Sequence, residues 1–218
     1  PELVISDPQL TVGLPPDITA WTGIDAMVHA IEAYCAPGFH PMAEGIAIEA
    51  IRLVARWLPQ AVADGKNLEA RGHMLVAASM GATAFQKGLG SVHSIAHVVG
   101  ALYNTHHGLT NAVILPFGLI QNADACADKL AHLARVLDRA DTSAGGFIDY
   151  VFDLREQLAI PPSLAGIGVD AERAREIGEL AFLDPSTPGN AKPVDAQDLC
   201  RLFLAAQSGD AEKLAPGW

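Results

Sequence analysis

The sequence lacks the features that mark membrane and secreted proteins. No apolar run reaches the roughly 20 residues that a membrane-spanning helix needs. The first residues do not show the basic and then apolar pattern of a secretory signal peptide. Cys35, Cys126 and Cys200 are scattered, odd in number and form no CxxC pair, so they predict neither a disulfide framework nor a cysteine zinc site. We therefore expect a cytoplasmic protein with no membrane partner.

Positive charge is also scarce. Fourteen lysines and arginines stand against 25 aspartates and glutamates, which gives a net charge of −11. Such a surface repels the phosphates of nucleic acids and of anionic lipids, so we expect no nucleic acid as a partner. Half of the 218 residues are hydrophobic, which is enough to build a sizeable core.

Sequence patterns typical of β-strands are almost absent. "LVI" at residues 3–5 is the one short apolar run that predicts a buried strand. A single strand cannot satisfy its own backbone hydrogen bonds, so we expect its sheet partners to lie upstream, in a part of the protein missing from this chain. After "GLPPD" the apolar residues recur at helical spacing, with Asp17 as the expected N-cap. The sequence therefore predicts an all-α domain with a residual N-terminal strand.

The expected helices share this periodicity and end at segments rich in glycine, proline, asparagine or aspartate. They are expected over residues 17–34, 42–63, 68–85, 91–102, 109–122, 124–138, 146–159, 170–182 and 195–207. Within them, Pro116 is expected to kink a largely buried helix. The residues after Ser208 are expected to form a loose tail.

The stretch "GLGSVHSIAHVVGALYNTHHG" at residues 88–108 holds four of the eight histidines. His93 and His97 are four residues apart, so on a helix they share a face. Asp25 and His29 form a second such pair in "GIDAMVHAIEAY", and Asp25 takes a position that an apolar helix would bury. A buried carboxylate is costly unless it is paired or binds a metal.

These two pairs and a histidine returning from the next segment predict a site for one divalent cation. Imidazole nitrogen and carboxylate oxygen suit Fe²⁺, Zn²⁺, Mn²⁺ or Ni²⁺. On spacing alone, the returning ligand is either His106 or His107. The histidines outside these groups are expected to be structural or exposed; they are His40, His73 and His132.

The glycines before His93 do not indicate a nucleotide site. "GLG" lacks the GxGxxG spacing, and no strand precedes it. Gly88 and Gly90 are therefore expected to form a turn, and the chain itself offers no dinucleotide fingerprint.

Four motifs, "TAWTGIDAMVHAIEAY", "ATAFQKGLGSVHSIAH", "GALYNTHHGLTNAVILP" and "DPSTPGNAKPV", closely resemble the iron-containing (group III) alcohol dehydrogenases. The resemblance runs in order from Pro1 to about Ser208 and is to the C-terminal half of those enzymes. Their N-terminal half is an α/β dinucleotide-binding domain, whose last strand is similar to "PELVISDP". The resemblance implies three segments: residues 1–15 as last strand and linker of that domain, 16–208 as the helical metal-binding catalytic domain, and 209–218 as a tail.

The resemblance also implies roles for particular residues. The family's metal ligands fall on Asp25, His29, His93 and His107, with His107 preferred to His106 because the last ligand directly precedes a glycine. His97 matches a histidine that lies near substrate and nicotinamide without binding the metal.

The implied activity is NAD(P)-dependent interconversion of a small alcohol and its aldehyde or ketone, with the metal as a Lewis acid on the substrate oxygen during hydride transfer. The implied cofactors are Fe²⁺, with Zn²⁺ as the alternative, and NAD(H) or NADP(H) in the full-length protein. We also expect a homo-oligomer. Two alternatives stay open: a glycerol dehydrogenase-like or dehydroquinate synthase-like zinc enzyme of the same fold, and a metal-binding helical fragment with no catalysis of its own. Under the main interpretation as well, we expect this chain alone to be inactive as a dehydrogenase.

Overall fold

The computed structural model describes residues 2–214, and these residues are helical with no β-strand. Eight α-helices and five short 3₁₀ helices lie within that range. The α-helices are α1 (Pro16–Cys35), α2 (Pro41–Ala63), α3 (Leu68–Ala84), α4 (Ser91–Tyr103), α5 (His107–Val136), α6 (Ala144–Gln157), α7 (Ala174–Phe182) and α8 (Ala196–Ser208). The 3₁₀ helices are η1 (Pro8–Thr11), η2 (Phe85–Lys87), η3 (Ala165–Ile167), η4 (Thr187–Gly189) and η5 (Ala211–Leu214). The predicted all-α class is confirmed.

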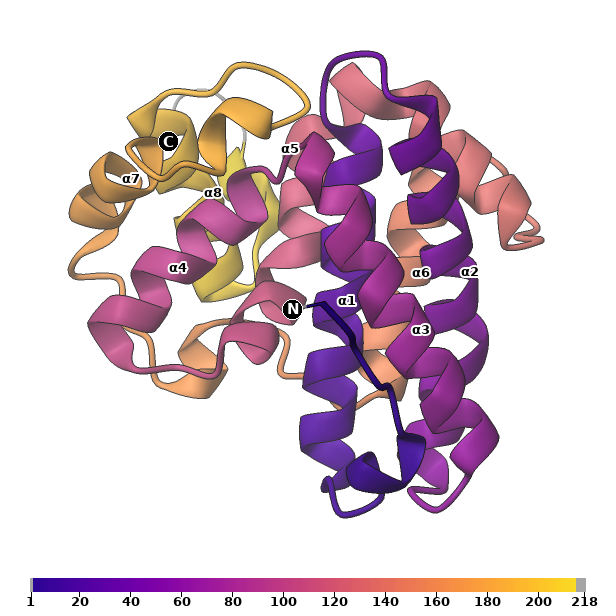
Figure 1. Cartoon of the computed structure of the whole chain (residues 1–218). Helices are drawn as coiled ribbons and strands as arrows, with labels where there is room; N and C mark the ends of the chain where they lie inside the picture. The colour runs from indigo at the N-terminus through magenta and orange to yellow at the C-terminus, as the bar shows by residue number, and fades with distance from the viewer. Residues whose placement is uncertain (1, 215–218) are drawn as a thin grey trace.

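The helices form two groups joined by the long helix α5 (Figure 1). Helices α1, α2 and α3 pack against one another, and the short connections between them make sequence neighbours antiparallel. Helices α4, α7 and α8 form the second group, while α5 contacts α1, α4, α6 and α8. The N-termini of α4 and α5 consequently lie against α1, which positions the histidine-rich segment beside the Asp25–His29 pair.

Local sequence explains where most helices begin and end. The side chains of Asn67, Ser143 and Asp195 cap α3, α6 and α8, each accepting a backbone N–H of the first turn. Helix α1 differs from the prediction, because it begins at Pro16 after Pro15 and Asp17 lies inside its first turn. Proline needs no N–H partner at this position and already has a helical φ angle, so it starts the helix without a side-chain cap.

Three further features differ from the predictions. Leu3, Val4 and Ile5 form no strand and are 77%, 69% and 79% exposed, because residues 2–214 contain no other strand with which they could pair. Helix α5 continues through Pro116, and its non-helical backbone angles occur at Cys126 instead. At the other end of the chain, η5 packs against α8, so residues 211–214 are not a loose tail; the tail's last four residues lie outside the described range.

No helix in the described range is long and apolar enough to span a bilayer. The three cysteines are free thiols.

Candidate metal centre

Asp25, His29, His93 and His107 come together where α1, α4 and α5 meet. Each offers one donor atom, and the four donor atoms lie within 4.8 Å of one another. The Oδ1 atom of Asp25 is 3.6 Å from Nε2 of His107 and 3.9 Å from Nε2 of His93. Two ligands of a tetrahedral site with bonds of 2.0–2.2 Å are separated by about 3.3–3.6 Å. Small side-chain movements would therefore place all four donors around one ion.

The close packing of α5 on α1 makes this convergence possible. Gly108 follows His107, and a Cβ atom at Gly108 would lie 2.6 Å from the backbone oxygen of Trp21. Any larger residue would push the start of α5, and His107 with it, away from Asp25. Gly108 is thus required for the close contact between α5 and α1.

The chemistry of the donors fits a cation. His93 is 1% exposed, and its Nε2 atom has no hydrogen-bond partner among residues 2–214. A buried polar atom without a partner costs free energy, and an ion at this position would bind its lone pair. The set of three imidazoles and one carboxylate suits Fe²⁺ or Zn²⁺ and would leave a net charge of about +1 on the site.

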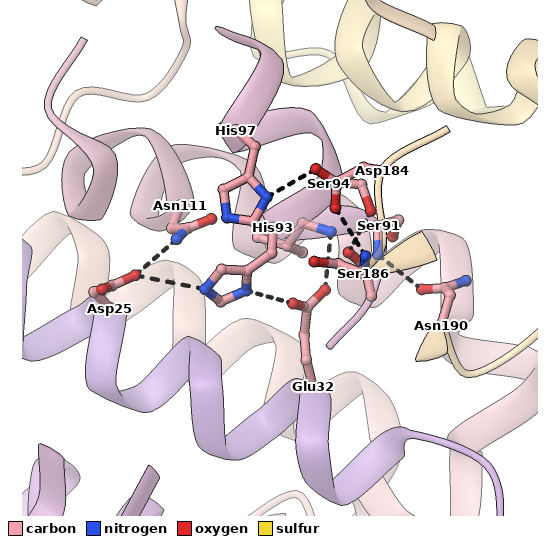
Figure 2. Close-up of polar contacts among 12 residues, drawn as sticks. Asp25, Glu32, Ser91, His93, Ser94, His97, Asn111, Asp184, Ser186 and Asn190 are labelled. Carbon is pink, nitrogen blue, oxygen red and sulfur yellow. Dashed lines mark hydrogen bonds and ion pairs between the residues drawn. The ribbon is translucent and has the colours of Figure 1, made fainter. Parts of the chain in front are cut away.

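Glu32 fixes the orientation of the His93 ring (Figure 2). Its Oε2 atom lies 2.6 Å from Nδ1 of His93, while its Oε1 atom accepts the backbone N–H of Val92 at 2.9 Å. With the proton on Nδ1 donated to Glu32, the lone pair of His93 is on Nε2, which faces Asp25. Glu32 therefore prepares His93 to bind an ion in one tautomer and one orientation.

The start of α4 is held by a second buried network. The side chain of Asn190 accepts the backbone N–H of Ser91 at 3.1 Å and donates to Oδ1 of Asn122 at 2.8 Å. Gly90 precedes this turn, and a Cβ atom there would lie 2.7 Å from Asn190 Oδ1 and 3.0 Å from Glu32 Oε1. Gly90 thus does more than form a turn, because it makes room for the two side chains that hold the first turn of α4.

His97 lies near His93 and His107 but makes a different contact, with Asp184, as Figure 2 shows. Its Nδ1 atom is 2.9 Å from Oδ2 of Asp184, and its ring stacks on that of His107 at 5.4 Å between centroids. The side chain of His97 is 40% exposed and that of His107 is 44% exposed. This edge of the site is therefore open, while His93 lies on the buried edge.

Burial and neighbouring charges set the proton affinity of the imidazoles. Burial lowers the pKa of His29 and the pKa of His107, although Asp25 opposes the shift in both. Burial also acts to lower the pKa of His93, but the hydrogen bond and charge of Glu32 outweigh it and raise that pKa. A metal competes with protons for imidazole, so the lowered values at His29 and His107 favour the metal.

Asn111 is a neighbour that the sequence did not reveal. It is fully buried, and its Nδ2 atom donates to Asp25 Oδ1 at 2.7 Å and lies 3.0 Å from Nε2 of His107. It therefore holds the carboxylate in place between the histidines. Glu32 and Asp184 were missed as well; Glu32 could have been found, because it follows His29 by three residues on the same face of α1.

The other histidines have separate roles. His106 caps α5 by accepting the backbone N–H of Leu109, and its ring lies against Trp21, so the structure does not place it among the convergent donors. His40 caps α2, and His73 stacks on Trp57. His132 lies against Tyr34.

The fold and this cluster define a helical domain with a candidate divalent-metal centre where three helices meet. Residues 19–207 match the family model described as the Fe-containing alcohol dehydrogenase family, C-terminal. The chain belongs to this family, as the sequence motifs predicted.

Known relatives show the same likeness. The chain is 37% identical over 212 residues to a 4-hydroxybutyrate dehydrogenase of Cupriavidus necator, with 93% of this chain and 55% of the relative covered. It is 36% identical to an NAD-dependent methanol dehydrogenase of Bacillus methanolicus, with 94% and 56% covered. A solved structure of a 1,3-propanediol oxidoreductase superposes with a TM-score of 0.89 at 36% identity, with 92% of this chain and 54% of that one covered. The chain thus spans about half the length of the curated relatives it matches.

Proposed function

We propose that this chain is the metal-binding part of an NAD(P)-dependent alcohol dehydrogenase acting on a small alcohol or aldehyde. One observation carries the proposal: four side chains bring one donor atom each to the same place, and Nε2 of His93 is buried there with no hydrogen-bond partner in the described part of the chain. The family membership and the names of the relatives, which are dehydrogenases and oxidoreductases of small hydroxyl compounds, support it.

In this proposal Asp25, His29, His93 and His107 hold Fe²⁺, with Zn²⁺ as the alternative occupant. The bound ion would supply Lewis acidity for an alcohol or carbonyl oxygen at the open edge of the site. Glu32 keeps His93 in the tautomer that presents Nε2, and Asn111 keeps the Asp25 carboxylate between the histidines. A set of four protein donors favours the iron-type enzymes over the glycerol dehydrogenase-like alternative, which uses fewer.

His97 is proposed to move a proton without binding the ion. Asp184 accepts a hydrogen bond from Nδ1, which orients the ring and leaves Nε2 to exchange a proton. The exposure of His97 gives that proton a path to solvent. The nicotinamide cofactor is proposed to bind a domain outside this chain, because no dinucleotide fingerprint occurs here. The segment boundaries at residues 15 and 208, the cytoplasmic location and the homo-oligomer stay predictions.

The test is turnover with and without metal. The chain joined to its cofactor-binding domain is purified without oxygen, stripped with a chelator, and assayed for NAD(P)-linked oxidation of small alcohols. We expect activity to disappear on stripping and to return with one equivalent of Fe²⁺ or Zn²⁺ per chain. Full activity in the stripped enzyme would contradict the proposed role of the site, and metal binding without any NAD(P)-linked turnover would contradict the proposed reaction.

A further inference from the structure

A second hollow lies away from the metal centre, beside α1, α3 and η1. It is a cavity of about 240 Å³, and none of the four convergent metal-site residues lines it. Its walls are mainly apolar, with Leu14, Ala26, Ala61 and Met74 among them. Sites for drug-sized ligands have volumes of about 300–1,000 Å³, so this cavity suits a smaller molecule.

Arg71 on α3 brings a positive charge to this apolar cavity. The residue is 3% exposed, and its guanidinium donates only to uncharged oxygens. Nε donates to the backbone oxygen of Gly65, Nη2 to that of Leu14 at 3.3 Å, and Nη1 and Nη2 to Oγ1 of Thr19 at 3.4 Å each. The contacts to Leu14 and Thr19 are long for hydrogen bonds, so Nη1 and Nη2 of Arg71 form only weak hydrogen bonds.

Arg71 is one of two buried arginines in the described range, and its surroundings differ from those of the other arginines that have a charged or aromatic partner. Five arginines form ion pairs with carboxylates; they are Arg52, Arg139, Arg173, Arg175 and Arg201. Arg155 is also buried, but its guanidinium lies over the rings of Phe117 and Phe152. Within the described range, Arg71 has neither a carboxylate partner nor an aromatic ring against it. A buried charge without compensation is costly, and the missing compensation is an anion.

We propose that this cavity binds a small aliphatic carboxylate, with its head against Arg71 and Thr19 and its chain among the apolar walls. The planar guanidinium matches the two oxygens of a carboxylate, and the hydroxyl of Thr19 can donate to the same group. The apolar walls disfavour phosphate and sulfate, whose remaining oxygens would lose hydration without gaining partners. The site is independent of the proposed dehydrogenase activity, because it shares no residue with the metal centre.

Hexanoate is the probe, with hexan-1-ol and hexylamine as ligands of the same length and different charge. Binding to the purified chain is measured by titration calorimetry and by NMR, with a chelator present so that carboxylate cannot bind a metal. We expect one hexanoate per chain, and binding of hexan-1-ol at least about tenfold weaker, since a hydrogen bond to a charged group contributes on the order of ten- to a hundredfold in affinity.

Three variants locate the site. Arg71→Gln should lower the affinity for hexanoate by about ten- to a hundredfold and leave the affinity for hexan-1-ol unchanged. Ala78→Leu adds bulk at an exposed position that lines the cavity, and it should weaken both ligands. Arg175→Gln is the control: it replaces an arginine that is exposed, whereas Arg71 is buried. It should change the affinity for neither ligand.

Equal affinity for hexanoate and hexan-1-ol in the unaltered chain would overturn the proposal, as would hexanoate binding that Ala78→Leu does not weaken. If circular dichroism shows that Arg71→Gln does not fold, the contrast between the two ligands and the Ala78→Leu variant still decide the outcome.

Discussion

The two edges of the candidate metal centre are built differently. On the inner edge, which consists of His93, Glu32 and Asn111, the residues are 1%, 8% and 0% exposed and are fixed by hydrogen bonds. On the outer edge, which consists of His97, His107 and Asp184, the two histidine side chains are 40% and 44% exposed. The inner edge is therefore already organised by the protein's own contacts, while the outer edge is open to solvent. This difference suggests that His93, Glu32 and Asn111 act on metal affinity, whereas His97, which is not among the convergent donors, acts on turnover.

The largest effect should come from removing the buried candidate ligand, His93. His93→Ala deletes one of four donors and should abolish stoichiometric metal binding, a loss greater than the roughly 10–100-fold caused by altering residues that merely support ligands. Elemental analysis after dialysis measures the metal content of each chain. His73→Ala, which alters a histidine stacked on Trp57, is the matched control and should keep one ion per chain. Retention of metal by His93→Ala would remove this residue from the site.

Replacing the outer histidine should separate turnover from metal binding. In the chain joined to the proposed cofactor-binding domain, His97→Ala should lower kcat by about 10²–10⁴-fold, the usual cost of losing a general acid–base group. Its metal content should stay near that of the unaltered protein, because His97 is not among the convergent donors. Loss of the ion together with the activity would instead show that His97 is a metal ligand. The two edges would then not differ in their effects on metal binding and turnover.

Weakening the inner support should produce an intermediate effect. Glu32→Gln retains the size of the side chain but replaces the carboxylate that accepts the proton of His93 Nδ1, so metal affinity should fall about 10–100-fold. Competition with a chromophoric chelator measures this change. Glu49→Gln, on an exposed face of α2, is the control and should have no effect. An unchanged affinity in Glu32→Gln would show that helix packing alone orients His93.

The smallest expected effect concerns the nicotinamide. NADH added to the isolated chain should show no saturable binding in the micromolar range, whereas metal should raise the melting temperature. A ligand that binds only the folded state at 100 times its Kd stabilises it by about 2.7 kcal/mol. Saturable NADH binding would place the cofactor site within this chain. It would contradict the proposal that the nicotinamide binds a separate domain.

The sequence predicted the helical fold and the convergence of the candidate ligands better than it predicted their support. Spacing of four residues on a helix is visible in sequence, and it linked Asp25 with His29. It also suggested that His93 and His97 act together, but their donors diverge because His97 turns to Asp184, 87 residues away in sequence. A contact between such distant residues leaves no local pattern.

Other features depended on packing that no single segment reveals. Asn111 follows His107 by four residues, yet an amide has no charge to mark it as a site residue. Gly90 was expected only to turn the chain, and its closeness to Glu32 and Asn190 became apparent once α4 was placed against α1. The strand expected at residues 3–5 needed a neighbour that residues 2–214 do not contain.

The most direct test of the central claim is an anomalous-difference map from crystals of the chain loaded with Fe²⁺ or Zn²⁺, recorded at the absorption edge of the metal. The proposal predicts one strong peak, about 2.0–2.3 Å from the donor atoms of Asp25, His29, His93 and His107, with His97 still paired to Asp184. A peak bound by His97, or metal found only at other positions on the protein, would contradict it.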